Sequence, residues 1–257
     1  MNHINRRTML SWLGTFAAGT VAPLSAIAET RRQKCAGILS LETFGIAQAE
    51  QMPRLHAYLE SSLLPVLSQI HDGPKLVFEA IVAPRMPHAL FLTGFSSFEE
   101  MLDIRGRVAA HSAIRQARAD LESMLVLDQV ESQVLLINPE SQRLQAAAKP
   151  LETGVFEIRS YHAPGYHEAP PESLGAVLNR AGIYPLLEAS TAIGEHLPRF
   201  TYLIPFANLT ARQDAWTGLD TNREWLSLQG ESVARHGAPI KVTDKSIYKL
   251  APYTSLA

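Results

Sequence analysis

The sequence repeats itself, and this repeat constrains the fold more than any other feature. Three segments of the second half each match a segment of the first half: 155–161 (VFEIRSY) with 38–44 (ILSLETF), 201–206 (TYLIPF) with 90–95 (LFLTGF), and 183–187 (IYPLL) with 63–67 (LLPVL). The matches keep the same order, and their offsets of 117, 111 and 120 positions drift only slightly. This pattern predicts two copies of one unit of roughly 110 residues, a common domain size.

The N-terminal segment, residues 1–28, has the layout of an export signal peptide. Arg6 and Arg7 precede an uncharged apolar run that ends in the small-residue pattern Ala26–Ala28. The paired arginines resemble a twin-arginine signal, with Met9 where such signals usually have phenylalanine. We therefore expect a periplasmic or secreted protein; the alternative is an uncut N-terminal membrane anchor.

Charge and cysteine content exclude several functional classes. The formal net charge is -2, so the chain has no basic field that would attract nucleic acid. Cys35 is the single cysteine, which rules out an intramolecular disulfide and a four-cysteine zinc site. Beyond the N-terminal segment the sequence has no stretch long and apolar enough to cross a bilayer. We expect no nucleic-acid partner, and no membrane association after signal cleavage.

Hydrophobic patterning predicts the same order of strands and helices in both units. In the first unit we expect a strand at 37–45, a helix at 50–70 that Pro65 bends or ends, strands at 76–82 and 88–95, a helix from about 97 to 121, and a strand at 127–137. In the second unit we expect a strand at 154–161, a helix at 172–188, strands at 190–196 and 199–206, a helical region at 208–236 broken near 220–222, and a strand at 246–251. The order β-α-β-β-α-β is that of a ferredoxin-like unit, whose antiparallel sheet has helices on one face only.

The second unit also contains a series of short motifs. They are Phe156–Tyr161 followed by Pro164 and Gly165, Gly182–Pro185, Phe200–Ile204, Arg212 with Trp216 and Glu224–Trp225, and the tail Leu250–Leu256. In these motifs residues 153–257 resemble the NIPSNAP domain, whereas 36–138 resemble that family only through the repeat and 139–152 form a linker. The family belongs with the dimeric α+β barrels, in which two ferredoxin-like units press their bare sheet faces together. The resemblance implies an α+β fold in which both units of one chain form an intramolecular barrel.

Alternation along the first strand of each unit predicts which side chains line that barrel. Glu157, Arg159 and Tyr161 share one face of their strand, and the apolar Phe156 and Ile158 share the other. We expect the apolar face to pack on the helices and the polar face to point into the barrel. The same parity sends Ile38, Ser40, Glu42 and Phe44 of the first unit inward.

The inward set supplies the candidate ligand-binding residues. Glu42 and Arg159 hold equivalent places in the repeat, so they could meet near a pseudo-two-fold axis. A buried arginine needs a carboxylate partner or an anion, so we predict a small-molecule site bordered by a set of polar side chains. The set is Glu42, Glu157, Arg159, Tyr161 and His162. The alternative is a satisfied buried network or a solvated barrel mouth.

Two further groups of polar residues have alternative interpretations. His162 and His167, with Glu168, could form a metal or proton-transfer cluster, or they could lie in a surface loop. Arg212 could pair with Asp214, and Trp216 is expected to pack in the core.

The sequence does not identify a reaction. It contains no Gly-x-Ser-x-Gly elbow, phosphate-binding loop or dinucleotide fingerprint, so the catalytic residues are unknown, and we expect no metal and no cofactor. The first hypothesis is a protein that holds a small, partly apolar molecule inside the barrel. The second is a cofactor-independent oxygenase or isomerase that uses Arg159, Tyr161 and a histidine at the rim. The third is an assembly or interaction module with a filled barrel; a homodimer could form in any of these cases.

Overall fold

The computed structural model of the protein describes residues 37–124, 126–138, 154–162 and 172–254. These residues belong to one compact unit, 34–257. The predicted signal peptide, the linker 139–152, and His167 with Glu168 lie outside the described residues.

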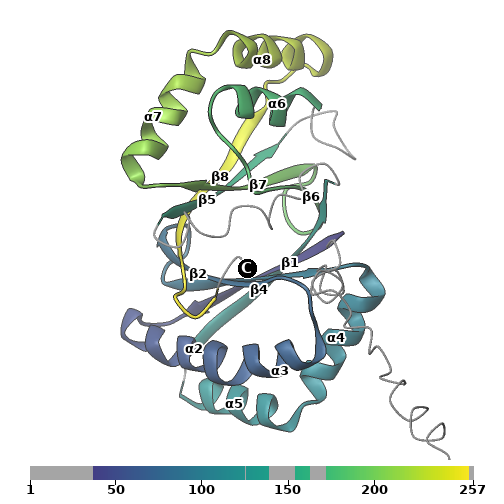
Figure 1. Cartoon of the computed structure of the whole chain (residues 1–257), viewed down its shortest axis with the longest axis vertical. Helices are drawn as coiled ribbons and strands as arrows, with labels where there is room; N and C mark the ends of the chain where they lie inside the picture. Colours follow the sequence, from purple (N-terminus) through teal and green to yellow (C-terminus); the bar gives the residue numbers. More distant parts are fainter. Residues whose placement is uncertain (1–36, 125, 139–153, 163–171, 255–257) are drawn as a thin grey trace, which may run out of the picture. The chain divides into compact units, whose positions relative to one another are not determined.

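The two halves of the described chain have the same order of elements (Figure 1). The first half contains β1 (Ile38–Ile46), a 3-10 turn η1 (Ala49–Gln51), α2 (Met52–Tyr58), the π-helical turn η2 (Leu59–Leu63), α3 (Leu64–Ile70), β2 (Lys75–Val82), β3 (His88–Phe95), α4 (Phe98–Ala110), α5 (Ser112–Ser123) and β4 (Leu127–Ile137). The second half contains β5 (Val155–His162), α6 (Glu172–Arg180), β6 (Leu187–Ile193), β7 (Arg199–Phe206), α7 (Leu209–Asp220), α8 (Arg223–His236) and β8 (Lys241–Leu250).

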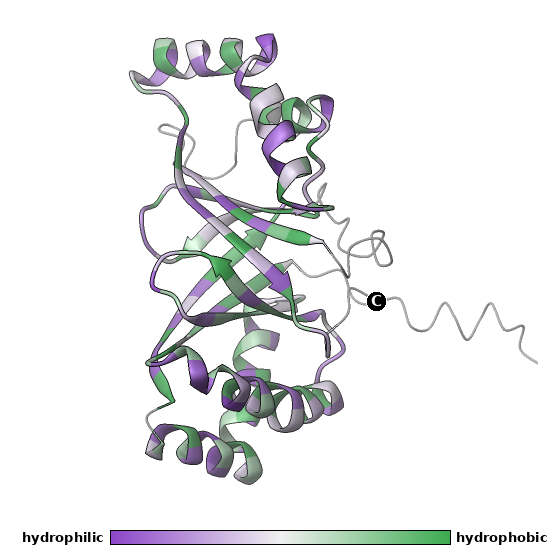
Figure 2. Cartoon of the chain, turned by 90° about the vertical axis from the view of Figure 1, so that its left-hand side faces the viewer, coloured by the Kyte–Doolittle hydropathy of each residue, from purple (hydrophilic) through white to green (hydrophobic). Residues whose placement is uncertain are grey.

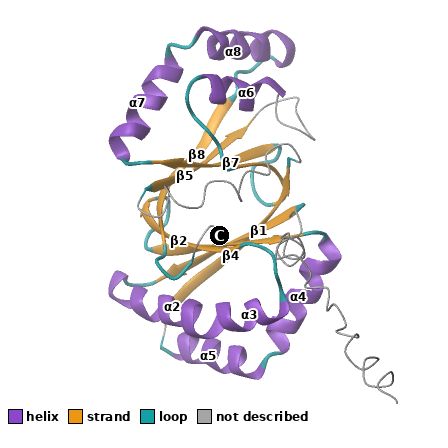
Figure 3. Ribbon diagram, viewed as in Figure 1, coloured by secondary structure: helices purple, strands orange, loops and turns teal. Residues whose placement is uncertain are grey.

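The strands of the described residues close into a barrel in the order β1-β3-β2-β8-β5-β7-β6-β4. Pairing between β2 and β8 and between β4 and β6 joins the halves, and both pairs are antiparallel. Helices α2 to α5 cover the sheet of the first half, and α6 to α8 cover that of the second (Figures 1 and 3). The predicted fold is confirmed: two ferredoxin-like units form an α+β barrel within one chain.

Strand register supports two of the three sequence matches. Ile38 pairs with Phe95 in the first half, and Val155 pairs with Phe206 in the second. These pairs are related by the offsets read from the sequence, 117 for the first strand and 111 for the third. The third match is wrong, because 63–67 is helical whereas 183–187 follows α6 and leads into β6.

Helix α6 ends at Arg180, eight residues before the predicted end at 188. Gly182 has a φ of 79°, the left-handed conformation that commonly terminates a helix. The amide of Ile183 then donates to the carbonyl of Leu178, which fixes the turn into β6. Strand β6 therefore begins at Leu187 rather than at 190, and β8 begins at Lys241 rather than at 246.

Pro65 does not end the helical segment, which continues to Ile70. Proline lacks an amide hydrogen, and its ring conflicts with the carbonyl one turn earlier in a regular α-helix. The chain accommodates it with the π-helical turn Leu59–Leu63, in which the amide of Leu64 donates to the carbonyl of Leu59. Of the two predicted effects of Pro65, bending or ending the helix, the second does not occur, and the hydrogen-bond ladder changes its spacing before the proline.

Both predicted second helices are divided in two. The first divides at His111, whose backbone is extended with φ -71° and ψ 119°. The second divides after Asp220 as predicted, and the Asn222 side chain accepts hydrogen bonds from the amides of Glu224 and Trp225 to cap α8. No helix of the described ranges is both long and apolar enough to span a bilayer.

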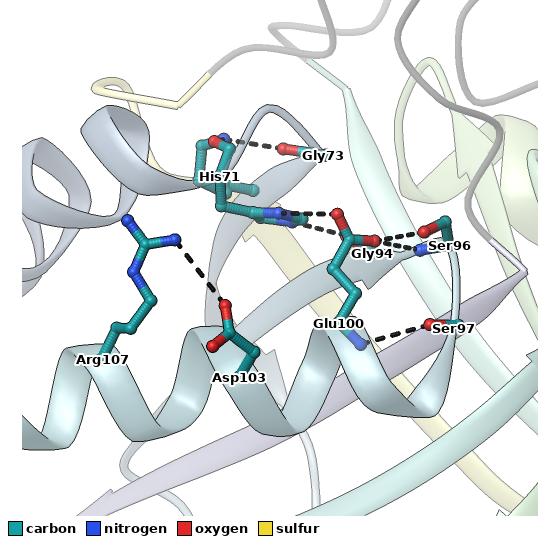
Figure 4. A network of polar contacts seen from close by, with 9 residues as sticks. His71, Gly73, Gly94, Ser96, Ser97, Glu100, Asp103 and Arg107 are labelled. Carbon is teal, nitrogen blue, oxygen red and sulfur yellow. Dashed lines mark hydrogen bonds and ion pairs between the residues drawn. The ribbon is translucent and has the colours of Figure 1, made fainter.

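A histidine fixes the junction between α3, β3 and α4 (Figure 4). His71 Nε2 lies 2.7 Å from the carbonyl oxygen of Gly94, and its ring stacks on Phe95 with centroids 4.8 Å apart. Desolvation by burial lowers the pKa of His71. Glu100 accepts a hydrogen bond from the Ser96 amide, and Ser97 caps α4 by accepting from the Glu100 amide. This network ties the turn after α3 to the start of α4.

Buried side chains form three apolar clusters, one inside the barrel and one under the helices of each half. The interior cluster includes Leu39, Leu41, Phe78, Phe156 and Ile158. The rings of Phe78 and Phe156, one from each half, meet with centroids 5.2 Å apart. The strands show hydrophobic and hydrophilic residues in alternation (Figure 2). The described interior is therefore a packed apolar layer that joins the two halves.

This arrangement reverses the predicted facing of the strands. Phe156 and Ile158 point into the barrel, whereas Tyr161 packs in the cluster under the helices of the second half. In the first half Ile38 and Phe44 likewise face the helices. The prediction that Glu42 and Arg159 point inward is therefore wrong. Strands β1 and β5 lie four places apart in the closed order, so these side chains leave opposite walls of the barrel and do not meet.

One end of the barrel interior is polar. Ser160 and Thr201 alternate with interior leucine and isoleucine positions, and their hydroxyl oxygens lie 3.0 Å apart. Arg199 donates to Ser160 at 3.0 Å and to Asp244 at 3.2 Å. The polar groups near this end thus pair across β5, β7 and β8, while Arg199 Nε is buried without a hydrogen-bond partner among the described residues.

Candidate functional site

The first half contains a cavity of about 360 Å³ between its sheet and its helices. Strands β1 and β3 form the floor, and α2, η2, α3, α4 and α5 form the walls. The apolar part of the lining includes Phe44, Leu63, Leu67, Phe91, Phe95 and Ile104. The cavity therefore lies outside the barrel, on the helix side of the first sheet.

Polar side chains of the floor are held by one arginine of α4. Arg105 Nη2 donates to Ser40 Oγ at 2.7 Å and to Glu42 Oε1 at 2.7 Å. It also donates to Ser132 Oγ at 3.0 Å. The Arg105 and Glu42 side chains are 36% and 27% exposed, so the pair lies at the boundary between the cavity and solvent. A third floor hydroxyl, that of Thr93, lines the cavity from β3.

A tyrosine and two further arginines complete the polar lining. Tyr58 of α2 is buried, and desolvation raises the pKa of its phenol, with Arg118 acting in the opposite direction and Glu42 adding to the rise. Arg115 and Arg118 of α5 also line the cavity, and both are exposed. The cavity thus combines apolar side chains on its walls and floor with a few polar groups on the floor and a cationic rim.

Two local irregularities of the chain shape this cavity. The π-helical turn carries Leu63 on the wall, next to Pro65. The break at His111 separates α4 from α5, and residues on both sides of it, Val108 and Ile114, face the cavity. An unbroken helix would continue in the direction of α4, so the break is what lets α5 form a separate wall.

Two of the predicted residues of the second half, Glu157 and Arg159, form an ionic network with Arg212 and Trp216 under α7. The Glu157 side chain is fully buried, and its Oε2 accepts from Trp216 Nε1 at 2.6 Å and from Arg212 Nε at 2.8 Å. Its Oε1 accepts from Arg212 Nη2 at 3.1 Å and from Arg159 Nη1 at 3.2 Å. The Arg159 guanidinium lies over the Trp216 ring, 3.6 Å from the centroid. Glu157 and Arg159 thus belong to a buried network, the kind of arrangement that the sequence left as the alternative, although Arg159 Nε has no hydrogen-bond partner among the described residues.

The remaining predicted residues lie apart from one another. Tyr161 is fully buried beside Arg159, and desolvation raises its pKa to about 12. His162 lies at the end of β5, with Nδ1 3.0 Å from the carbonyl oxygen of Pro198. Of the five predicted residues, only Glu42 lines the cavity of the first half. A ligand contact by the other four stays a prediction.

Sequence reasoning missed most of the cavity. The arginines of α4 and α5 have the spacing of an ordinary solvated helix face, so their pattern in the sequence did not indicate a cavity. Arg212 pairs with Glu157 and not with Asp214, so that predicted pairing is wrong. Trp216 is buried in the core, as predicted. A useful signal was available in β1, because Ser40 and Glu42 share one face of a strand whose other face is leucine.

Within the described ranges, no group of three His, Cys, Asp or Glu side chains could hold a metal ion.

Comparisons with known proteins establish the fold. No protein-family model matches the chain, and no curated protein matches it. Among solved structures, an anthrone oxidase-like protein has a TM-score of 0.51 at 10% identity, covering 86% of this chain and 93% of its own.

Two further structures represent the other kinds of neighbour. A putative monooxygenase from Lactobacillus acidophilus NCFM has a TM-score of 0.45 at 9% identity, covering 86% of this chain and 98% of its own. An uncharacterized NIPSNAP domain protein from Burkholderia xenovorans has a TM-score of 0.35 at 15% identity, covering 40% of this chain and 95% of its own. At such identities the likeness concerns the fold alone. The chain has the dimeric α+β barrel fold, with both units in one polypeptide.

Proposed function

We propose that this protein binds a small, partly apolar molecule in the cavity of its first half. The observation that carries the proposal is the cavity itself, with a volume of about 360 Å³ and large apolar side chains on both its floor and its walls. Ligand sites in proteins typically measure about 300–1,000 Å³ and combine apolar walls with a few polar groups that orient the ligand. This cavity falls at the lower end of that range.

The site lies on the helix side of the sheet, not at the barrel centre where the sequence placed it. Inside the barrel, Phe78 and Phe156 are fully buried and in contact, so the two sheets pack directly on each other there. On the helix side, the hydroxyls of Ser40 and Thr93 and the Glu42 carboxylate belong to the cavity floor. These groups can donate to or accept from a polar atom of a bound molecule.

A cavity-filling variant and a matched control test the proposal. Val108 lines the cavity at the end of α4, whereas Leu102 of the same helix is 64% exposed and is not part of the lining. We expect small amphiphiles such as octanoate or 2-naphthol to raise the thermal unfolding temperature of the wild type and of Leu102→Trp. Val108→Trp should abolish this stabilisation, because the indole occupies the space of the ligand. Lack of stabilisation of the wild type by the whole panel, or equal stabilisation of Val108→Trp, would overturn the proposal.

A second candidate function is a cofactor-independent oxygenase that uses the same cavity. The Glu42 carboxylate on the floor could accept a proton from a bound phenol or anthrone, and the neighbour with a TM-score of 0.51 is an anthrone oxidase-like protein. The test is oxygen uptake with an anthrone substrate. Uptake by the wild type that Glu42→Gln abolishes would support an oxygenase, whereas equal rates with and without protein would restrict the function to binding.

The proposal includes export to the periplasm or the medium, on the basis of the residues 1–28 alone. A homodimer of the two-unit chain is a further prediction, which light scattering on the mature protein would check.

A further inference from the structure

We propose that the ligand of the first-half cavity is an amphipathic organic anion, with its apolar part between the helices and the sheet and its anionic group at the α5 rim. This inference rests on the proposed binding function and names the chemical class that the site selects.

Charge at the cavity is unevenly distributed. Its charged lining consists of Arg105, Arg115 and Arg118 against the single carboxylate of Glu42. Arg105 lies 2.7 Å from Glu42, so these two charges largely neutralise each other. The two arginines of α5 then give the rim a positive potential.

A carboxylate outside the lining compensates this rim only in part. Arg118 Nε lies 3.1 Å from Glu122 of the same helix, and the two side chains are 49% and 58% exposed. An exposed pair one helical turn apart is weak and is screened by salt. A ligand anion can therefore compete with Glu122 for this guanidinium.

Polarity also changes along the cavity from inside to outside. Phe91, Phe95 and Leu67 are buried, whereas Arg115 and Arg118 are exposed. The two arginines are three residues apart in α5, so they project from one side of that helix. Guanidinium groups form paired hydrogen bonds with carboxylate or phosphate oxygens. A ligand with an apolar body and one anionic end matches this gradient, and it would enter with the apolar end first.

A ligand with a cationic head group is disfavoured. A cationic head group would face the α5 arginines at the rim, and the Glu42 carboxylate that could attract it is already paired with Arg105. A neutral head group would gain nothing from the rim charges. The expected order of affinity is therefore anion, then neutral molecule, then cation.

Three ligands with the same alkyl chain provide the test: octanoate, 1-octanol and octylammonium, titrated into the mature protein by calorimetry. Octanoate should bind on the order of tenfold more tightly than octanol, and octylammonium more weakly than either. Raising the salt concentration should reduce the advantage of octanoate over octanol, because exposed charges are screened.

Two variants locate the effect. The double variant Arg115→Gln with Arg118→Gln should lose most of the octanoate advantage while its affinity for octanol is unchanged. Arg107→Gln is the matched control, because Arg107 is exposed on α4, pairs with Asp103 and is not part of the cavity lining. It should bind all three ligands as the wild type does.

The outcomes distinguish failure of the proposed ligand class from failure of the proposed binding function. Equal binding of octanoate and octanol by the wild type, or tightest binding of octylammonium, would overturn the ligand class and leave the binding function intact. An octanoate advantage that survives in the double variant would also overturn it. Failure of all three ligands to bind would overturn the proposed function itself.

Discussion

Glu157→Gln should strongly destabilise the protein, because the carboxylate accepts four hydrogen bonds from three side chains. The Glu157 side chain is 0% exposed, and its partners Arg159 and Arg212 are 10% and 16% exposed. The fourth member, Trp216, donates to Glu157 at 2.6 Å. Neutralising this acid would leave two guanidinium groups without a counter-charge in a poorly solvated layer.

The expected loss follows from the four contacts. Glutamine keeps one acceptor oxygen, but its amide nitrogen faces donors, so about two of the hydrogen bonds to Arg212, Arg159 and Trp216 are lost. A hydrogen bond involving a charged group contributes about 1.5–3 kcal/mol, which predicts a loss of about 3–6 kcal/mol. Removing one partner of a buried ion pair typically costs about 3–5 kcal/mol, so both routes indicate about 4 kcal/mol.

Urea unfolding of the mature protein, followed by circular dichroism, measures this loss. Glu224→Gln is the matched control, since Glu224 pairs with Arg180 at the surface and both side chains are more than half exposed. After allowance for solvent screening, that substitution should change the free energy of unfolding by less than about 1 kcal/mol. Octanoate binding should be the same in both variants, because neither residue belongs to the first-half cavity.

Two results would refute the structural interpretation of Glu157. The first is a loss of stability no larger than that of Glu224→Gln, which would mean that the network does not hold the second half together. The second is near-normal stability with loss of ligand binding, which would make Glu157 the ligand contact that alternation along its strand suggested.

Three other expectations concern the barrel, the pH dependence and the export signal. Phe78→Ala should cost about 3–5 kcal/mol in urea unfolding, since Phe78 is fully buried between the sheets; a loss below about 1 kcal/mol would indicate an unpacked interior. The pKa of Tyr161 is raised to about 12, so its neutral form is favoured by folding, and stability should fall from about pH 10 to pH 12 as the unfolded chain ionises first. Tyr161→Phe should flatten this fall, and an unchanged alkaline profile would contradict the assignment. Replacing Arg6 and Arg7 by lysine should leave the protein in the cytoplasm by cell fractionation, whereas continued export would exclude a twin-arginine signal.

The sequence predicted the strands that alternation and turn residues define clearly. Bounds for β3, β4 and β7 agree with the structure; β3 and β7 are largely apolar runs, whereas β4 mixes polar and apolar residues before its apolar end. The end of α6 was missed because apolar residues continue to Leu187, while Gly182 alone ends the helix. The start of β8 was missed because 241–245 (KVTDK) has little apolar character. That segment is a strand because β5, which lies far from it in the sequence, supplies its backbone partners.

The candidate site was harder to predict because alternation identifies two faces of a strand without naming which one is inside. In β5 the neighbouring residues Phe156, Glu157 and Ile158 are 0%, 0% and 6% exposed, so both faces are buried. Burial alone therefore could not assign them, and the deciding factor is which layer can supply hydrogen-bond donors.

Within the described residues the interior cluster comes mostly from strands, with Leu186 and Ala83 beside them, whereas the helix layer carries long side chains that reach back to the sheet. Arg212 meets Glu157 across 55 positions of sequence, and Arg105 meets Glu42 across 63. In both halves, then, a carboxylate on the first strand is held by an arginine of a helix after the third strand. A carboxylate on the first strand of either half is thus held on the helix side, whereas Arg199 and Asp244 pair with each other at the polar end of the barrel. The two carboxylates differ in their surroundings. Arg159 stacks on Trp216 and covers Glu157, whereas Arg105 and Glu42 stay partly exposed, so Glu42 lies beside a cavity.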